Sequence, residues 1–252
     1  MIFVSSWDDG HPLDARLGEL LERHGLNGTF YVPIRNREGH AVMSHADMRN
    51  LDRLFEVASH TLDHCYLTSL SHTDCEHQVR EGKQQLESIL GHSVPGFCYP
   101  GGKWNARVRQ TVIDAGFEHA RTVGNLWLGI TRDAFSIPTT AQFYPHRAKV
   151  LWRNYLTGGH YGKRLHALRT LTASGDWLTA MKHLADNCAA RDGVMHIWGH
   201  SWEIEQHGLW PQLDALLTHV ASLRPRALTV GELASMKSGF DAPQQNEGRS
   251  RP

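Results

Sequence analysis

The apolar positions of the chain follow two alternating patterns. Residues 2–7 (IFVSSW) form a short β-favouring run, and leucines then recur at helical spacing across residues 11–25. The same alternation predicts further strands at 28–33, 55–60, 96–100, 117–122, 193–200 and 227–230, and further helices at 44–54, 72–90, 104–115, 161–172, 175–190 and 209–222. Strands that alternate with helices are typical of a mostly parallel sheet covered by helices.

The number of these units indicates the fold class. About seven of them in roughly 240 residues favour an α/β fold, an irregular (β/α) barrel of about seven strands, over an open doubly wound sheet. We expect residues 1–237 to form this barrel as one domain and the polar tail 238–252 to be disordered. The sequence leaves open whether residues 123–190 form a lid, an insertion or part of the barrel.

Charge and apolar runs narrow the possible partners and compartments. Lys plus Arg and Asp plus Glu both total 26, so the formal net charge is zero. This neutral balance disfavours binding to nucleic acid or to an anionic membrane surface, although it does not exclude a local basic patch. No apolar run approaches the roughly 18 residues of a membrane span. The absence of a signal-peptide pattern and of CxxC spacing predicts a cytoplasmic protein with reduced thiols. The oligomeric state is not indicated.

Two carboxylates follow the first predicted strand. Asp8 and Asp9 stand side by side, and Gly10 directly after them allows a tight turn. Adjacent like charges repel each other, and a bound cation would relieve that repulsion. The alternative is that Asp8 and Asp9 only form a turn or cap the helix that follows.

Two histidines follow the third predicted strand. His60 and His64 lie four residues apart in SHTLDH, a spacing that brings two imidazoles onto one face of a helical turn. With 18 histidines in the chain, such a pair also arises by chance. Together with Asp9, however, the pair makes an Asp and two His set with positions left for water and substrate, as in catalytic metal sites.

A third histidine ends the predicted strand 193–200. His200 is expected at the mouth of the barrel, and a histidine titrates near neutral pH, which suits it to proton transfer. His196 lies four residues earlier and faces the same side but deeper. We interpret His196 as a buried, hydrogen-bonded core residue.

Four segments in this order resemble the polysaccharide deacetylase family, also called the NodB homology family. SWDDG is similar to the family's first motif, of the TFDDG type, and SHTLDH to its HTxxH metal motif. FCYPGG is similar to the third motif, and WGHSW to the closing motif that supplies the catalytic histidine. The resemblance spans roughly residues 1–235 and implies a NodB-like barrel with deacetylase activity on carbon–nitrogen (non-peptide) amide bonds.

The resemblance also implies a role for each matched residue. Asp9, His60 and His64 would bind one divalent metal, usually zinc. Asp8 would be the general base on the metal-bound water, the nucleophile. His200 would protonate the departing amine.

The third motif departs from the family pattern. The family often has RPPY there, with an arginine that pairs with the catalytic aspartate, but Cys98 stands in the place of that arginine and Gly101 in that of the tyrosine. The backbone N–H of Gly101 would hold the oxyanion, and Tyr99 and Trp202 are candidates to contact the substrate. Arg121, at the end of strand 117–122, is our candidate for the missing cation, with a surface arginine as the alternative.

The sequence therefore predicts a metal-dependent hydrolase that removes an acetyl or formyl group from an amino sugar or glycoconjugate. Its partner would be a carbohydrate or acylated amine substrate. A cyclic amide or imide hydrolase is one alternative. A non-catalytic carbohydrate-binding barrel is another, favoured by Cys98 in place of the family arginine and disfavoured by the presence of Asp8 and His200.

Overall fold

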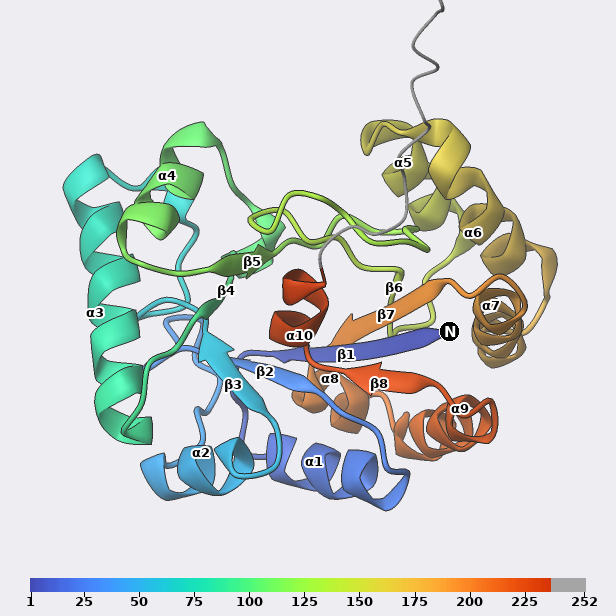
Figure 1. Ribbon diagram of the computed structural model, residues 1–252, viewed down its shortest axis with the longest axis horizontal. Coiled ribbons are helices and arrows are strands. Elements are labelled where there is room, and N and C mark those ends of the chain that lie inside the picture. The colour runs from blue at the N-terminus through green and yellow to red at the C-terminus, as the bar shows by residue number, and fades with distance from the viewer. Residues whose placement is uncertain (237–252) are drawn as a thin grey trace, which may run out of the picture.

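A curled parallel sheet forms the centre of the molecule (Figure 1). The structure is a computed structural model that describes residues 1–236, so the tail 238–252 lies outside the described residues. The strands of the described part are β1 (Ile2–Asp8), β2 (Thr29–Val32), β3 (Glu56–Ser59), β4 (Gly96–Cys98), β5 (His119–Arg121), β6 (Ala141–Gln142), β7 (Val194–Gly199) and β8 (Arg226–Leu228). Their order is β5-β4-β3-β2-β1-β7-β6, and β8 pairs with β1.

The sheet curls into an irregular barrel. Every pair of neighbouring strands in it is parallel. A backbone bridge joins Arg121, at the end of β5, to Ile137, and the chain runs on from there into β6 beside β7. The circuit of strands therefore closes through residues 137–142. The predicted irregular (β/α) barrel of about seven strands is confirmed, with β6 as an additional strand.

Helices surround most of this sheet (Figure 1). They are α1 (Asp14–Arg23), α2 (His45–Asp52), α3 (His72–Leu90), α4 (Ala106–Asp114), α5 (Ala148–Thr157), α6 (Tyr161–Ala173), α7 (Trp177–Ala190), α8 (Ser201–Gln206), α9 (Trp210–Ser222) and α10 (Val230–Ser235), with 3₁₀ turns at Leu67–Ser69 and Pro100–Gly102. Among the described residues, no helix is long and apolar enough to cross a membrane.

The structure differs from the predicted elements mainly in the short ones. Residues 123–190, whose place was open, supply β6, which closes the barrel, and the helices α5 to α7. The sequence pattern did not reveal β6, α8 or α10, because such short elements show little periodicity, and the longer helix α5 was also missed. The predicted strand 227–230 ends early, because the Thr229 side chain accepts a hydrogen bond from the Glu232 N–H and thereby caps α10.

Strand β1 carries side chains to both sides of the sheet. Phe3 and Trp7 pack in the large core between the sheet and the helices. Val4 packs instead with Tyr31 in the smaller cluster inside the ring of strands. Because side chains alternate along a strand, Asp8 falls on the inner side with Val4. The central strand therefore delivers a carboxylate to the interior at its carboxyl end.

Helix α10 closes the end of the barrel where the strands begin. Glu56, the first residue of β3, accepts hydrogen bonds from the Thr29 hydroxyl (2.6 Å) and from the Gly231 N–H of α10 (3.0 Å). Its other oxygen lies 3.3 Å from Nε2 of His119. Burial raises the pKa of Glu56, but these contacts outweigh burial and hold the pKa below its usual value. Helix α10 therefore does not cover the opposite end of the barrel, where the strands end.

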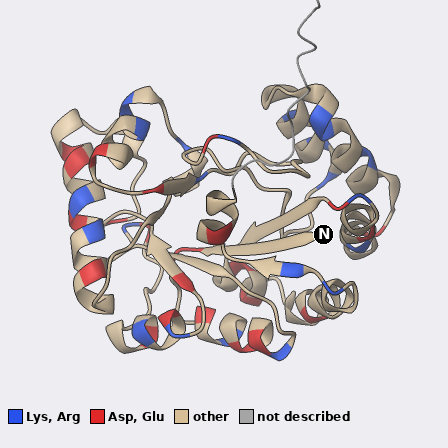
Figure 2. Cartoon of the chain, viewed as in Figure 1, with Lys and Arg blue, Asp and Glu red and all other residues tan. Residues whose placement is uncertain are grey.

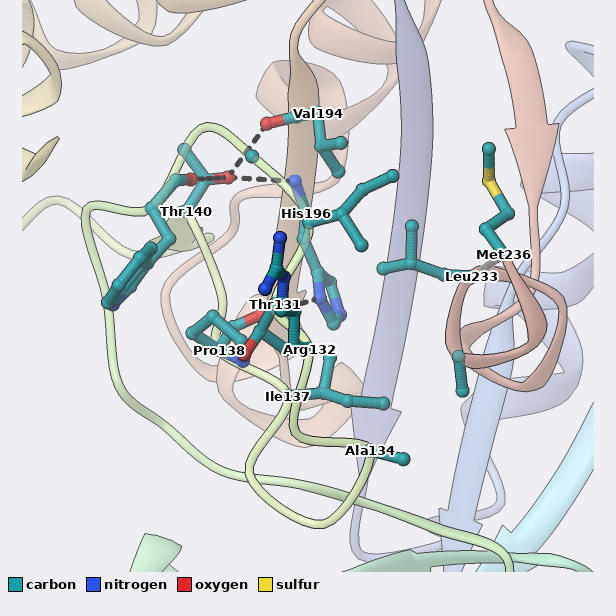
Figure 3. A pocket seen from close by; sticks show the side chains of 14 residues that line it. Thr131, Arg132, Ala134, Ile137, Pro138, Thr140, Val194, His196, Leu233 and Met236 are labelled. Atoms are coloured by element: carbon teal, nitrogen blue, oxygen red, sulfur yellow. Dashed lines mark hydrogen bonds between the residues drawn. The ribbon is translucent and has the colours of Figure 1, made fainter. Parts of the chain in front are cut away.

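A cavity of about 220 Å³ remains beside α10, lined by the loop 127–140, by β7 and by α10. Figure 3 shows the His196 ring beside Pro138 and Ile137 on one side of it. Nδ1 of His196 donates to the Pro138 carbonyl (3.1 Å), and Nε2 hydrogen-bonds the Ser6 hydroxyl (2.9 Å). Burial, aided by the positive charge of Arg121, lowers the pKa of His196 to about 3. His196 is thus a neutral, hydrogen-bonded core residue, as the sequence pattern indicated.

We expect Glu56→Gln to lower the free energy of unfolding by about 1–3 kcal/mol at neutral pH, because the amide keeps the shape but loses the charge. The folded pKa of Glu56 lies below its unfolded value. Its contribution is therefore complete above the unfolded pKa and is lost as pH falls through the folded pKa. Urea unfolding of both proteins at neutral and acid pH measures this, and a difference that did not shrink in acid would contradict it.

Candidate metal and catalytic site

Polar side chains from three strands meet at the carboxyl end of the barrel. Asp8 ends β1 and Asp9 follows it, His60 and His64 follow β3, and His200 follows β7. Parallel strands place their carboxyl ends at one edge of a barrel, where active sites form. The two aspartates, His60 and His64 are buried, and the His200 side chain is 18% exposed. The structure thus brings these five predicted residues together.

The backbone turns sharply where the candidate ligands lie. Asp9, Thr61 and His64 have φ angles of 78°, 72° and 50°, a conformation that costs a non-glycine residue about 1–3 kcal/mol. Gly82 of α3 allows this helix to approach the loop, because a Cβ at that position would lie 2.6 Å from the carbonyl carbon of Thr61. Packing against α3 therefore helps to hold the loop that carries both histidines.

Asp9, His60 and His64 form a compact group of candidate ligands. Oδ1 of Asp9 lies 3.0 Å from Nε2 of His64 and 3.8 Å from Nε2 of His60, and one ligand atom from each residue lies within 4.8 Å of the others. Nδ1 of His60 is 2.8 Å from the Cys98 carbonyl, which can only accept, so Nδ1 carries the proton. Burial lowers the pKa of His60 to about 4, so at neutral pH its Nε2 presents a lone pair.

A lone pair and a carboxylate therefore face each other at this point. Oδ1 of Asp9 is buried and accepts no hydrogen bond from the described residues. Burial raises the pKa of Asp9, but His64, His200 and His60 outweigh burial and hold the pKa well below its usual range, so the carboxylate is ionised. One oxygen ligand and two imidazole ligands fit a divalent cation such as zinc.

A second group, Asp8, His60 and Cys98, also lies within 4.8 Å. It fits a cation less well. Burial raises the pKa of the Cys98 thiol well above its usual range, so the thiol keeps its proton. A protonated thiol is a poor metal ligand. Asp8 also already has a positively charged partner.

That partner is Arg121, which meets Asp8 inside the ring of strands. Nη2 of Arg121 donates to Oδ1 of Asp8, and the two side chains are 0% and 5% exposed. The guanidinium also lies over the rings of Trp198 (5.2 Å) and Tyr31 (5.0 Å), whose faces attract a cation. The β4–β5 register pairs Arg121 with Cys98. The small Cys98 thus stands beside the strand that supplies the guanidinium.

His200 is held by a chain of polar contacts. Its Nδ1 lies 3.3 Å from Oε2 of Glu203, which accepts a hydrogen bond from Nε2 of Gln142 in β6 (2.9 Å). Burial lowers the pKa of His200, but Glu203 and the two aspartates outweigh burial and raise the pKa above its usual value. The contact between His200 and Glu203 was not predicted from the sequence. The only available signal was the three-residue spacing from His200 to Glu203.

Trp202 contacts Asp9 directly. Its indole N–H donates to Oδ2 of Asp9 (2.9 Å), and its ring stacks on His40 with 4.3 Å between ring centroids. Nε2 of His200 lies 3.9 Å from the same Asp9 oxygen. A hydrogen bond to the outer oxygen of a candidate ligand fixes the orientation of its carboxylate.

Tyr99 and Gly101 lie on the segment that follows β4. The Tyr99 side chain is buried against Phe97, and its hydroxyl donates to the Phe135 carbonyl (3.1 Å). The structure therefore does not bring this side chain to the carboxylate cluster. Gly101 has a φ of 61°, and a Cβ there would lie 2.7 Å from the Tyr66 ring, so this turn requires glycine.

Comparison with known families agrees with this geometry. Residues 2–120 match the family model described as polysaccharide deacetylase. This part of the chain, slightly less than half of it, is therefore similar to the polysaccharide deacetylase family. Enzymes of this family hydrolyse N-acetyl amide bonds and use a divalent metal. The matched residues include both aspartates, His60 and His64, whereas Arg121 and His200 lie beyond the match. No curated protein sequence matches the chain.

Two solved deacetylase structures share the fold at low identity. The chitin deacetylase of Colletotrichum lindemuthianum has a TM-score of 0.60 and 18% identity, over 97% of this chain and 89% of that chain. A putative polysaccharide deacetylase from Mycobacterium smegmatis has a TM-score of 0.61 and 15% identity, over 92% and 88%. For the Streptococcus pyogenes deacetylase PplD, the values are 0.49 and 17%, over 54% of this chain. The chain spans only 62% of that protein's length.

We expect Arg121→Met to lower the free energy of unfolding by about 3–5 kcal/mol, because it leaves the Asp8 carboxylate buried without a partner. The double variant with Asp8→Asn should lose less free energy of unfolding than the sum of the two single variants. Asp8→Asn removes the buried negative charge that Arg121→Met leaves without a partner. Chemical denaturation of the four proteins measures this coupling. Arg53→Met, at an exposed position, is the matched control and should have little effect. Additive costs would contradict the buried ion pair.

Proposed function

We propose that this protein is a metal-dependent hydrolase that removes an acetyl or formyl group from the nitrogen of an amino sugar or glycoconjugate. One observation carries the proposal: Asp9, His60 and His64 each place a ligand atom within 4.8 Å of the others at the carboxyl end of the barrel, with Oδ1 of Asp9 3.8 Å from Nε2 of His60. Asp9, His60 and His64 would hold the cation, and zinc is our candidate. Such a cation polarises a carbonyl oxygen and makes a coordinated water more acidic.

The neighbouring residues supply the proton transfers in this proposal. Asp8 accepts the proton of the attacking water, and Arg121 holds Asp8 by one oxygen, Oδ1, which orients the carboxylate. His200 gives a proton to the departing amine. Its Nδ1 is engaged with Glu203, while its Nε2 faces Asp9. The two proton carriers therefore come from different strands, β1 and β7.

Three residues are proposed on the substrate side. The Gly101 N–H is the candidate donor to the oxyanion. Trp202 is the candidate for a sugar ring, since its ring is only partly covered. Tyr99 is proposed to contact the substrate only through its backbone, because its hydroxyl donates a hydrogen bond to the Phe135 carbonyl.

We further propose a cytoplasmic location. All four cysteines, Cys65, Cys75, Cys98 and Cys188, are free thiols. Free thiols are usual in a reducing compartment, whereas secreted proteins often form disulfides. The substrate would then be a glycan precursor, glycoconjugate or other acylated amine inside the cell.

The alternatives are affected differently by the structure. The non-catalytic barrel drew its support from Cys98 in the place of an arginine, and Arg121 beside Asp8 removes that support. The cyclic amide or imide hydrolase would use the same cluster. Assays of acyl release from N-acetylated and N-formylated amino sugars, beside a cyclic imide, separate these two activities.

Metal content tests the site directly. We expect protein purified without chelator to carry about one zinc or other divalent ion per chain, and Asp9→Ala and His60→Ala to lose it, because each removes one of three ligands. Elemental analysis measures this. His72→Ala, at an exposed histidine, is the control and should retain the metal. A metal-free wild type that cannot be loaded would overturn the metal mechanism.

Trp202→Phe should weaken metal binding roughly 10-fold or more, because it keeps an aromatic ring but removes the N–H that orients Asp9. Calorimetric titration of the metal-stripped protein with zinc gives the dissociation constant independently of activity. Trp152→Phe, at a tryptophan on α5, is the matched control. Equal zinc affinities for the Trp202 variant and the wild type would show that the indole N–H has no role in holding the ligand.

A further inference from the structure

One part of the chain is entirely free of acidic residues. Residues 134–175 contain no Asp or Glu but six Lys or Arg, although the whole chain has 26 of each kind of charge. This segment forms α5 and α6, which lie side by side at the edge of the barrel (Figure 1). Figure 2 shows basic positions on these helices and no acidic ones. Although the net charge of the whole chain is zero, this segment carries a local excess of positive charge.

The outward face of α5 combines cations with large apolar side chains. Lys149, Trp152, Arg153 and Leu156 follow helical spacing and are all exposed. Trp152 is 46% and Leu156 is 61% exposed, and Tyr161 at the start of α6 is 52% exposed. No residue of α5 is buried. We call these five residues the α5 face. Apolar side chains this large and this exposed are uncommon in a cluster unless another surface covers them.

The α5 face has a fixed shape, because Arg164 ties the two helices together. Arg164 is 2% exposed, and its guanidinium donates to the carbonyl oxygens of Asn154, Tyr155 and Gly159 at the end of α5. It also donates to the backbone and side chain of Asn125 (2.8 and 3.1 Å). The helix pair is thereby bonded to the body of the barrel and presents its exposed side chains in one arrangement.

We propose that the α5 face binds an anionic lipid bilayer surface. Lys149 and Arg153 would contact lipid phosphates, while Trp152, Leu156 and Tyr161 would insert at the level of the headgroups. Basic and apolar side chains on one helix surface are the combination that such binding requires. The helix lies on the membrane and does not cross it.

A sugar platform is the main competing explanation for exposed aromatic rings. Rings that bind sugars work together with polar side chains that hydrogen-bond hydroxyl groups. The α5 face has no carboxylate or amide side chain, and its most exposed apolar residue is the aliphatic Leu156. Its positive charge also has no counterpart in a neutral glycan. Charge and side-chain type together therefore favour a lipid surface, and this inference does not depend on the proposed hydrolase activity.

Sedimentation with vesicles tests the proposal on the full-length protein. Phosphatidylcholine vesicles containing a quarter of phosphatidylglycerol should bind the protein at an ionic strength of about 0.15 M, and vesicles of phosphatidylcholine alone should bind it at least about tenfold more weakly. Lys149→Glu with Arg153→Glu should abolish the preference for anionic vesicles. Trp152→Ser with Leu156→Ser should reduce binding by about tenfold or more, because less apolar surface is inserted.

Matched controls separate the α5 face from general surface effects. Arg53→Glu with Arg80→Glu makes the same charge change at exposed positions elsewhere, and Leu54→Ser removes another exposed leucine. Both controls should bind like the wild type. No binding to anionic vesicles, or equal losses in the control and α5-face variants, would overturn the proposal. Binding of chitin oligosaccharides that quenches Trp152 fluorescence, without vesicle binding, would overturn it in favour of a sugar platform.

Discussion

Taking a carboxylate and a guanidinium out of water costs several kcal/mol for each ion, and the contact between Asp8 and Arg121 offsets this cost inside the barrel. The pair links the first strand to the fifth across the inside of the ring. It holds the Asp8 carboxylate, which strand alternation directs inward, next to Asp9 in the chain. The candidate ligand Asp9 therefore directly follows a residue that is held by an ion pair.

The two ends of the barrel use buried charge differently. At the amino end, Glu56 accepts hydrogen bonds from Thr29 and Gly231, and Nε2 of His119 lies 3.3 Å from its other oxygen, where the helix α10 closes the ring. At the carboxyl end, Oδ1 of Asp9 lies 3.0 Å from Nε2 of His64 and 3.8 Å from Nε2 of His60, on a backbone in an unfavourable conformation. Backbone strain of this kind often marks functional sites.

Most of the fold and part of the site could be predicted from sequence. The long helices α3, α6, α7 and α9 and the strands β1 and β7 were predicted close to their observed bounds. The pairs Asp8 with Asp9 and His60 with His64 could also be predicted, because each pair lies within one short segment of the sequence. The short elements β6, α8 and α10 were missed, because their stability comes from packing rather than from their own pattern. Helix α5 was missed as well, although its residues follow helical spacing.

The alternation of strands and helices, the barrel class and the motifs that hold the aspartates and the two close histidines could all be predicted from the sequence. Which distant residues meet them depends on the folded barrel. Trp202 reaches Asp9 across 193 residues, Gln142 reaches Glu203 across 61, and Arg121 stands beside Cys98 because β4 and β5 pair in that register. Hydrophobic periodicity fixes which face a side chain takes, whereas its partner depends on strand order and register, which are set by the packing of the whole barrel.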